Sequence, residues 1–431
     1  MVATNKTGGM LFILGILALL AFLQAPARAA DEEAALREQA LKLNDITGEE
    51  AQTTALQDLL NSPTNTKKML AVAAKMAGEK DQPFKANATF MLARAAQAFR
   101  DYDASDKFYK IFQKQAKELE SVTKTVQWFV GYSGLLYETK KYDKCEELSR
   151  DFFTLAQKLE EAAKDAGQKP DEALSRAQGP MFRRLVMSLA KQGEFKEANT
   201  ILDKLLEGNP DNYSLADLKG FVLREDGKYD EAVKVYDELI DKINKDKELT
   251  RDEKRDLANE MRYMLSNVYI ENKDVDKAAD QLKELLKAEP DNPTYNNDLG
   301  FIWADNDKNI EESEKMIRKA IEEDKKLRHK NNPKIKPEDD KDNAAYLDSL
   351  GWVLFKQKKY DDAKKYLEQA IEDKEGQHVE IFDHLGDTYM ALGDKAKAVE
   401  AWKKGVEAAS DNKREQQRKT DVEKKIKANE K

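Results

Sequence analysis

Apolar and small residues recur along most of the chain in units of about 34 residues. In the unit that begins at Asn259, the recurring places hold Leu265, Tyr269, Ala278, Leu282 and Pro290. Residues three or four apart lie on the same face of an α-helix, so this spacing predicts two helices whose apolar faces meet. Because proline lacks a backbone donor, Pro290 is expected to end the second helix. Each unit is therefore predicted to be a helical hairpin.

The pattern predicts about eight such hairpins, of which the first two are degenerate. They begin near Lys85, Val126, Gly179, Tyr213, Asn259, Pro293, Ala344 and Val379. Small residues at the eighth and twentieth places let the paired helices approach closely, and large apolar residues fill the space between hairpins. A single hairpin cannot bury both of its faces, whereas stacked hairpins can. The expected fold is all-α, a right-handed α-solenoid of stacked helical hairpins.

The remaining segments predict how the chain is organised around this array. We assign residues 1–30 to a signal peptide, 31–84 to a helical N-terminal cap, 85–178 to the degenerate units, 179–412 to the regular array and 413–431 to a charged tail. The tail is either an end helix or a frayed coil. Insertions interrupt the array near residues 241–258 and 324–343. Pro333 and Pro337 predict a loop in the second insertion, which is either a solvated connection or a protrusion that contacts a partner.

The first residues have the pattern of a secretory signal. Lys6 precedes an apolar run from Met10 to Leu23, and small residues follow at positions 27, 29 and 30. Such a run spans about 21 Å at roughly 1.5 Å per residue, less than the roughly 30 Å hydrocarbon core of a bilayer. We therefore expect cleavage after Ala29 or Ala30, export to the periplasm and no permanent membrane span. Retention of the run as an anchor is the alternative.

Composition argues against catalysis and against nucleic-acid binding. The formal net charge is -9, whereas phosphate binding needs a basic surface. His378 and His384 lie six residues apart, which does not fit a metal-binding pair on one helix face. Cys145 falls at a small-residue place, where a buried thiol is expected. We expect no catalytic residue, no cofactor and no metal site.

Three stretches of the last repeats carry a family resemblance. They are Asn297 to Asp305 (NDLGFIWAD), Tyr346 to Leu354 (YLDSLGWVL) and His384 to Tyr389 (HLGDTY). In these residues the chain resembles exported bacterial tetratricopeptide repeat (TPR) proteins. Among them are outer-membrane lipoprotein adaptors of periplasmic carboxyl-terminal processing proteases. The resemblance implies a scaffold whose first helices line a concave groove that binds a partner polypeptide.

By resemblance to TPR peptide binders, six places of each first helix face this groove. In this chain those places include Asp217, Phe221, Tyr263, Asn267, Asn297, Asp298, Phe301, Asp305, Asp348, Trp352, Asp383, His384 and Asp387. The aromatic side chains act either as anchors for a partner or as packing between adjacent first helices. The carboxylates repel a free carboxylate, so the favoured occupant is an apolar and basic segment.

The predicted function is a non-catalytic, protein-binding scaffold or adaptor of the bacterial periplasm. Its partners are expected to be protein or peptide segments and not nucleic acid. Two alternatives stay open at this point. One is a TPR module of a polysaccharide or cell-envelope export or assembly machine, and the other is the regulatory TPR part of an enzyme complex.

Overall fold

Every regular element of the described chain is a helix. The computed structural model describes residues 30–372, 374–410 and 413–430. The predicted signal peptide, apart from Ala30, lies outside these residues. The chain divides into two compact units, residues 1–192 and 193–431, called unit 1 and unit 2 below. Among the described helices, none combines the length and the apolar character needed to cross a bilayer. The prediction of an all-α repeat fold is confirmed.

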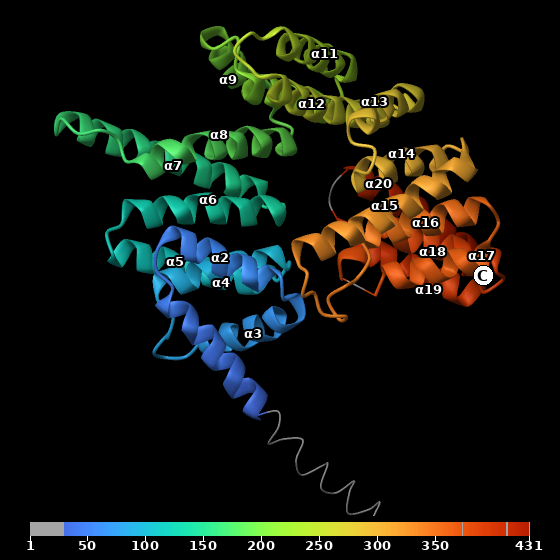
Figure 1. Ribbon diagram of the computed structural model, residues 1–431, viewed down its shortest axis with the longest axis horizontal. Coiled ribbons are helices and arrows are strands. Elements are labelled where there is room, and N and C mark those ends of the chain that lie inside the picture. Colours follow the sequence, from blue (N-terminus) through green and yellow to red (C-terminus); the bar gives the residue numbers. More distant parts are fainter. Residues whose placement is uncertain (1–29, 373, 411–412, 431) are drawn as a thin grey trace, which may run out of the picture. The chain divides into compact units, whose positions relative to one another are not determined.

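Unit 1 is a stack of antiparallel helices, which Figure 1 shows in blue to green. A helix over residues 30–42 leads through the short 3-10 helix η1 (Leu43–Asp45) into the stack. The stack comprises α2 (Glu49–Leu60), α3 (Pro63–Met76), α4 (Ala86–Ala98), α5 (Tyr102–Glu118), α6 (Val122–Glu138), α7 (Tyr142–Asp165) and α8 (Glu172–Gln192). The two degenerate hairpins correspond to α4 with α5 and α6 with α7. Asp101 and Ser121 begin α5 and α6 by accepting hydrogen bonds from backbone donors of the first turn.

Large aromatic side chains close the hairpins of unit 1. Phe108, Tyr109 and Phe152 are completely buried. The Tyr109 ring reaches the backbone of the next hairpin, where a Cβ atom added to Gly131 would lie 2.7 Å from the ring. The eighth places of these two hairpins hold Ala93 and Ser133, and the twentieth places hold Ser105 and Cys145. The repeat pattern is therefore weak here although the hairpins are present.

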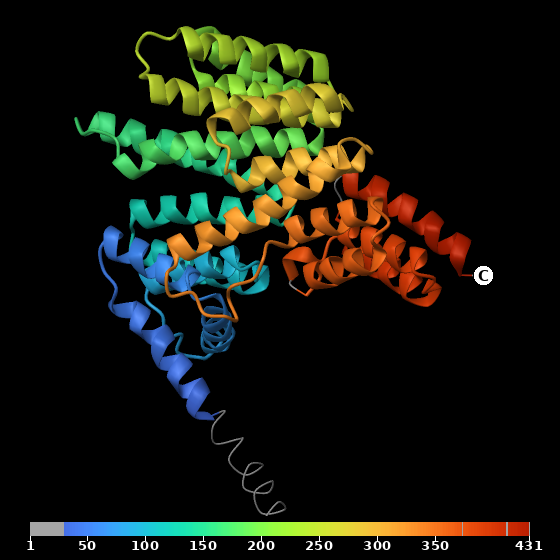
Figure 2. The same ribbon diagram turned by 45° about the vertical axis from the view of Figure 1, so that its right-hand side comes forward.

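Unit 2 contains the regular hairpins that begin at Tyr213 and beyond, whereas the predicted unit from Gly179 is divided, with its first helix, α8, in unit 1 and its second helix in unit 2. Its helices are α9 (Phe195–Gly208), α10 (Tyr213–Glu225), α11 (Tyr229–Lys245), α12 (Arg251–Glu271), α13 (Val275–Ala288), α14 (Pro293–Asp305), α15 (Ile310–Asn331), α16 (Ala344–Lys356), α17 (Tyr360–Ala370), η2 (Lys374–Gly376), α18 (Val379–Ala391), α19 (Lys395–Ala408) and α20 (Lys413–Asn429). The hairpins pair α10 with α11, α12 with α13, α14 with α15, α16 with α17 and α18 with α19. The last helix, α20, packs against α18 and α19, as Figure 2 shows for the dark red helix that ends at C.

Glycine at the eighth place lets the two helices of a hairpin touch. A Cβ atom added to Gly300, Gly351 or Gly386 would lie within 2.7 Å of a side chain on the second helix. At Gly351 the nearest atom is Cγ of Leu367, at 2.5 Å. Real Cβ atoms do not approach so closely, so any larger residue would push the helices apart. The close approach expected from the sequence is therefore present in these three hairpins.

The two insertions mainly lengthen helices. The first extends α11 and α12, and Thr250 begins α12 with a capping box in which Glu253 is the second member. The second extends α15 to Asn331 and continues as a loop to α16. Arg328 ties this loop back to α15 through Asp342 at 3.0 Å, and His329 does so through Asp340 at 2.9 Å.

Candidate partner-binding faces

The first helices of unit 2 are joined to one another by pairs of predicted site residues. We call the surface formed by α10, α12, α14, α16 and α18 the first-helix face. Tyr263 Oη on α12 donates to Asp298 Oδ2 on α14, at 2.9 Å. Trp352 Nε1 on α16 donates to Asp305 Oδ1 on α14, at 3.0 Å. Each contact ties one first helix to its neighbour, so these carboxylates also hold the stack together.

The Trp352 ring lies inside an aromatic stack. It stacks on His384 of α18 with centroids 4.0 Å apart and on Phe355 of its own helix at 5.0 Å. The Lys356 ammonium lies 5.1 Å from its centroid, and the Phe301 ring lies 6.4 Å from the His384 ring. Trp352 thus packs between adjacent first helices, one of the two roles that the sequence left open. The residue is half-buried, so part of its surface stays exposed.

Asp348 and His384 form a buried pair between α16 and α18. Their Oδ1 and Nδ1 atoms are 2.8 Å apart, and both residues are buried. Burial alone lowers the pKa of His384, but the charge and hydrogen bond of Asp348 outweigh it and the net shift is upward. The Nε2 atom of His384 has no hydrogen-bond partner among the described residues. Asp348 is therefore the main source of electrostatic stabilisation for the protonated ring.

The other predicted residues of this face have mostly local partners. Asp217 is buried and accepts a hydrogen bond from Tyr236 of the same hairpin, at 3.3 Å. Phe221 lies 5.2 Å from the Arg224 guanidinium. Asn297 donates to Asp298 at 3.2 Å, and burial raises the pKa of Asp298 above its usual range. Asn267 on α12 is half-buried.

Asp383 and Asp387 on α18 bind the last helix of the chain. Lys425 Nζ donates to Asp383 Oδ1 at 2.6 Å and to both oxygens of Asp387 at 2.7 Å. Arg418 donates to Asp383 at 3.2 Å and to Glu380 at 2.6 Å. The last repeat therefore places three carboxylates on one face of α18 and holds two cations of α20 there.

The charges of this contact shift the pKa values of its members. Burial by itself lowers the pKa of Lys425, but Asp383 and Asp387 outweigh it and the net shift is upward. Burial, together with the charge of Asp383, raises the pKa of Asp387 although Lys425 opposes the shift. Between the two cations, Val422 is completely buried against Val379, Ala398 and Trp402. A basic helix with one apolar anchor is thus the occupant that α18 and α19 accept in this chain.

Sequence reasoning missed Glu380, Arg418 and Lys425 as members of this contact. One more step of about 34 residues from Val379 reaches Lys413, where α20 begins. That step puts Arg418 at the sixth place and Lys425 at the thirteenth, both of which were assigned to the groove in earlier repeats. Extending the period into the charged tail would have found Arg418 and Lys425, and Glu380 stands at the second place of the unit that begins at Val379.

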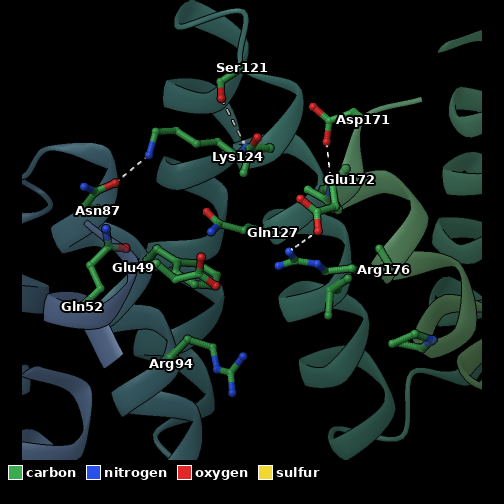
Figure 3. Close-up of a pocket in the computed structure, with 17 residues that line it drawn as sticks. Glu49, Gln52, Asn87, Arg94, Ser121, Lys124, Gln127, Asp171, Glu172 and Arg176 are labelled. Carbon is green, nitrogen blue, oxygen red and sulfur yellow. Dashed lines mark hydrogen bonds and ion pairs between the residues drawn. The ribbon is translucent and has the colours of Figure 1, made fainter. Parts of the chain in front are cut away.

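A cleft of about 760 Å³ lies in unit 1, between α2, α4, α6 and α8. We call it the unit 1 cleft. Figure 3 shows Asn87 and Arg94 of α4, Lys124 and Gln127 of α6 and Arg176 of α8 around the same space. None of the site residues predicted from the sequence lines this cleft. Counted from Ala86, where α4 begins, Asn87 and Arg94 stand at the second and ninth places of this hairpin, so counting places in the degenerate units would have found them.

The thiol and the carboxylates give no sign of catalysis. Cys145 is buried, its Sγ contacts the carbonyl oxygen of Ser133 at 3.3 Å, and burial raises the pKa of the thiol. A raised pKa keeps the thiol protonated and poorly nucleophilic. Within the described residues, no group of three or more His, Cys, Asp or Glu side chains is arranged to hold a metal ion.

These features define a class, a repeat protein of stacked helical hairpins in which first helices carry the candidate contact surfaces. Sequence models of the tetratricopeptide repeat family match residues 183–247, 251–326, 344–375 and 379–412. Over these residues the chain is therefore similar to the tetratricopeptide repeat family. Such repeats serve as scaffolds that bind other proteins on extended surfaces.

Three individual proteins are similar to parts of the chain. A TPR repeat-containing protein of Pseudomonas aeruginosa is 28% identical over 235 residues, which are 53% of this chain and 35% of that protein. The chain thus spans about a third of that relative's length. A solved tetratricopeptide repeat protein from Parabacteroides merdae is 14% identical with a TM-score of 0.44, covering 69% of this chain and 98% of that one. BtubC from P. vanneervenii is 19% identical with a TM-score of 0.37, covering 56% and 92%.

Proposed function

We propose that this protein is a non-catalytic scaffold of the bacterial periplasm that holds a segment of a partner polypeptide on its first-helix face. The observation that carries the proposal is the contact of α18 with α20. There Glu380, Asp383 and Asp387 hold Arg418 and Lys425 at hydrogen-bonding distances. The last repeat thereby binds a basic, amphipathic polypeptide segment, here one supplied by the chain itself.

The same chemistry extends upstream along the face. Asp305 is exposed, and Phe301 and Trp352 beside it are half-buried. An exposed carboxylate next to accessible aromatic rings suits an apolar and basic segment, because large rigid rings supply most of the binding energy and the charge sets the preference. Asp348, in contrast, is buried against His384 and serves the stack.

The experiment is a capture from periplasmic extract of the native host, with identification by mass spectrometry. Three full-length forms are compared, the wild type, Asp305→Lys and Asp361→Lys. Asp361 lies on the second helix α17 with its side chain 85% exposed, so its variant makes the same charge change away from the first-helix face. We expect a polypeptide that the wild type and Asp361→Lys retain and Asp305→Lys loses.

If all three forms captured the same molecules, the first-helix face would not be the surface that binds the partner. Recovery of a polysaccharide in place of a polypeptide would favour the alternative role in an envelope export or assembly machine. The proposed location rests on the signal pattern of the first residues. N-terminal sequencing of the protein from the periplasmic fraction tests it, with Ala30 or Asp31 expected as the first residue.

A further inference from the structure

We propose that residues 324–343, the insertion between α15 and α16, bind the anionic headgroup surface of a phospholipid membrane. We call these residues the protrusion. The proposal goes beyond the proposed function, because the partner is a lipid surface and not a polypeptide, and it uses no residue of the first-helix face.

The protrusion extends past the packed part of unit 2. The helix α15 has 22 residues, whereas the neighbouring first helices α14 and α16 have 13 each. Ala320 is the last buried residue of α15, and no residue from Ile321 to Ala345 is buried. The loop that Figure 1 shows in orange between α15 and α16 continues from this helix end. The protrusion is therefore an exposed tip and not the lining of a cleft.

Positive charge is concentrated in the first part of the protrusion. Residues 325–337 contain six Lys or Arg and no Asp or Glu. Over residues 324–343 there are seven Lys or Arg and five Asp or Glu, so the protrusion has a net charge of +2 in a chain whose net charge is -9. An anionic surface thus repels the chain as a whole and attracts the protrusion.

The structure places three carboxylates of the protrusion at its base. Asp342 and Asp340 bind the Arg328 guanidinium at 3.0 and 3.3 Å. Asp324 binds the same guanidinium, and Asp340 also contacts His329 at 2.9 Å. All three carboxylates are half-buried. Their negative charge is therefore neutralised within the protrusion, mainly by Arg328.

The lysines at the tip have no such partners. Lys330, Lys334 and Lys336 are exposed, and the side chain of none of them has a hydrogen bond or an ion pair with a residue that the structure describes. Two apolar side chains lie among them, because Leu327 is 43% exposed and Ile335 is half-buried. Ammonium groups bind anionic headgroups, while lysine stems and apolar side chains enter the boundary between headgroups and acyl chains.

A membrane fits this tip better than a soluble polyanion does. An ammonium is a compact point charge that needs no fixed geometry of its acceptor, so the lysines suit headgroups that move in the plane of a bilayer. A soluble polyanion offers no apolar phase to Leu327, whereas the bilayer does.

The test is co-sedimentation of the full-length protein with vesicles of equimolar phosphatidylcholine and phosphatidylglycerol, at low and high salt. Vesicles of phosphatidylcholine alone are the control for charge. All forms of the protein carry the same residues 1–29, so differences between forms report on other residues. We expect the protein to sediment with the anionic vesicles and to lose this association as salt rises, because ions screen the contact.

Two double charge reversals show which residues bind the vesicles. Lys334→Glu with Lys336→Glu should weaken the association by roughly 25-fold or more, because each lysine near an anionic surface strengthens binding by about fivefold. Lys196→Glu with Lys204→Glu makes the same charge change at two exposed residues of α9 and should weaken it by less than about threefold. These four lysines have no described ion pair to lose, so both variants are expected to fold, and thermal melts verify this.

Several results would overturn the assignment. They are equal sedimentation with the two kinds of vesicle, no sedimentation with the anionic vesicles, or equal losses in the two double variants. Soluble polyglutamate that binds with the same dependence on Lys334 and Lys336 would also contradict it, since the partner would then be an acidic polymer. None of these outcomes bears on capture through Asp305, so a failure here leaves the proposed function unaffected.

Discussion

Val422→Ala tests whether α20 is held to the last repeat by its apolar anchor. Val422 is completely buried, with Val379, Ala398 and Trp402 around it. The substitution removes two methyl groups, worth about 0.8 kcal/mol each, and leaves a small cavity. The expected cost is therefore about 2 kcal/mol. Since α20 ends the array and contacts only α18 and α19 strongly, the loss should be local to that helix.

Hydrogen exchange read by mass spectrometry measures this loss segment by segment. At about 1.4 kcal/mol per tenfold, a cost of about 2 kcal/mol speeds the opening of α20 by about 30-fold. Peptides from α14 to α17 should exchange as in the wild type. Lys424→Ala is the matched control, because Lys424 is 70% exposed and pairs only with Asp421 of the same helix. Exchange in α20 that is unchanged by Val422→Ala, or acceleration spread evenly over unit 2, would refute the reasoning.

Three further predictions concern single contacts. Gly351→Ala places a Cβ atom 2.5 Å from Leu367, so it should lower the free energy of unfolding by about 1 to 3 kcal/mol in urea titrations. In the control Gly208→Ala the added Cβ atom meets no atom within 4 Å, so the free energy of unfolding should not fall. The pKa of His384 is raised, so its pair with Asp348 stabilises the fold fully below about pH 6.5, and this contribution is lost as pH rises through the folded-state pKa. The difference in unfolding free energy between the wild type and His384→Gln should therefore shrink as pH rises above about 6.5, and a constant difference would contradict the pair. Lys425→Ala should speed hydrogen exchange in α20 by several-fold, which corresponds to about 1 kcal/mol for a partly exposed ion pair. Equal effects of Lys425→Ala and Lys424→Ala on this exchange would contradict the contacts of Lys425 with α18.

The regular hairpins of unit 2 were predictable because their small and large residues alternate at fixed places. Gly351 with Leu367 and Gly386 with Trp402 are pairs of this kind, and both members of each pair stand at the expected places of the repeat. In unit 1 the eighth places hold Ala93 and Ser133 and the twentieth places hold Ser105 and Cys145, so the pattern is weaker and the cleft was not found.

The contact of α20 was hidden for another reason. Its helix is almost wholly polar, and only Val422 and Ile426 mark its apolar side. Its partners lie far away in the chain, as with Arg418 and Glu380, which are separated by 38 residues. A local pattern of charges does not reveal which distant carboxylates will neutralise them.

The central claim, that first helices carry the partner, is tested most directly by photo-crosslinking in the native host. A benzoyl-phenylalanine placed at Asn267, on the first helix α12, is compared with one at Lys234, on the second helix α11. The account predicts a crosslinked polypeptide from position 267 that is lost when Asp305→Lys is added, and none from position 234. Crosslinks that arise equally from both positions, or only from position 234, would contradict it.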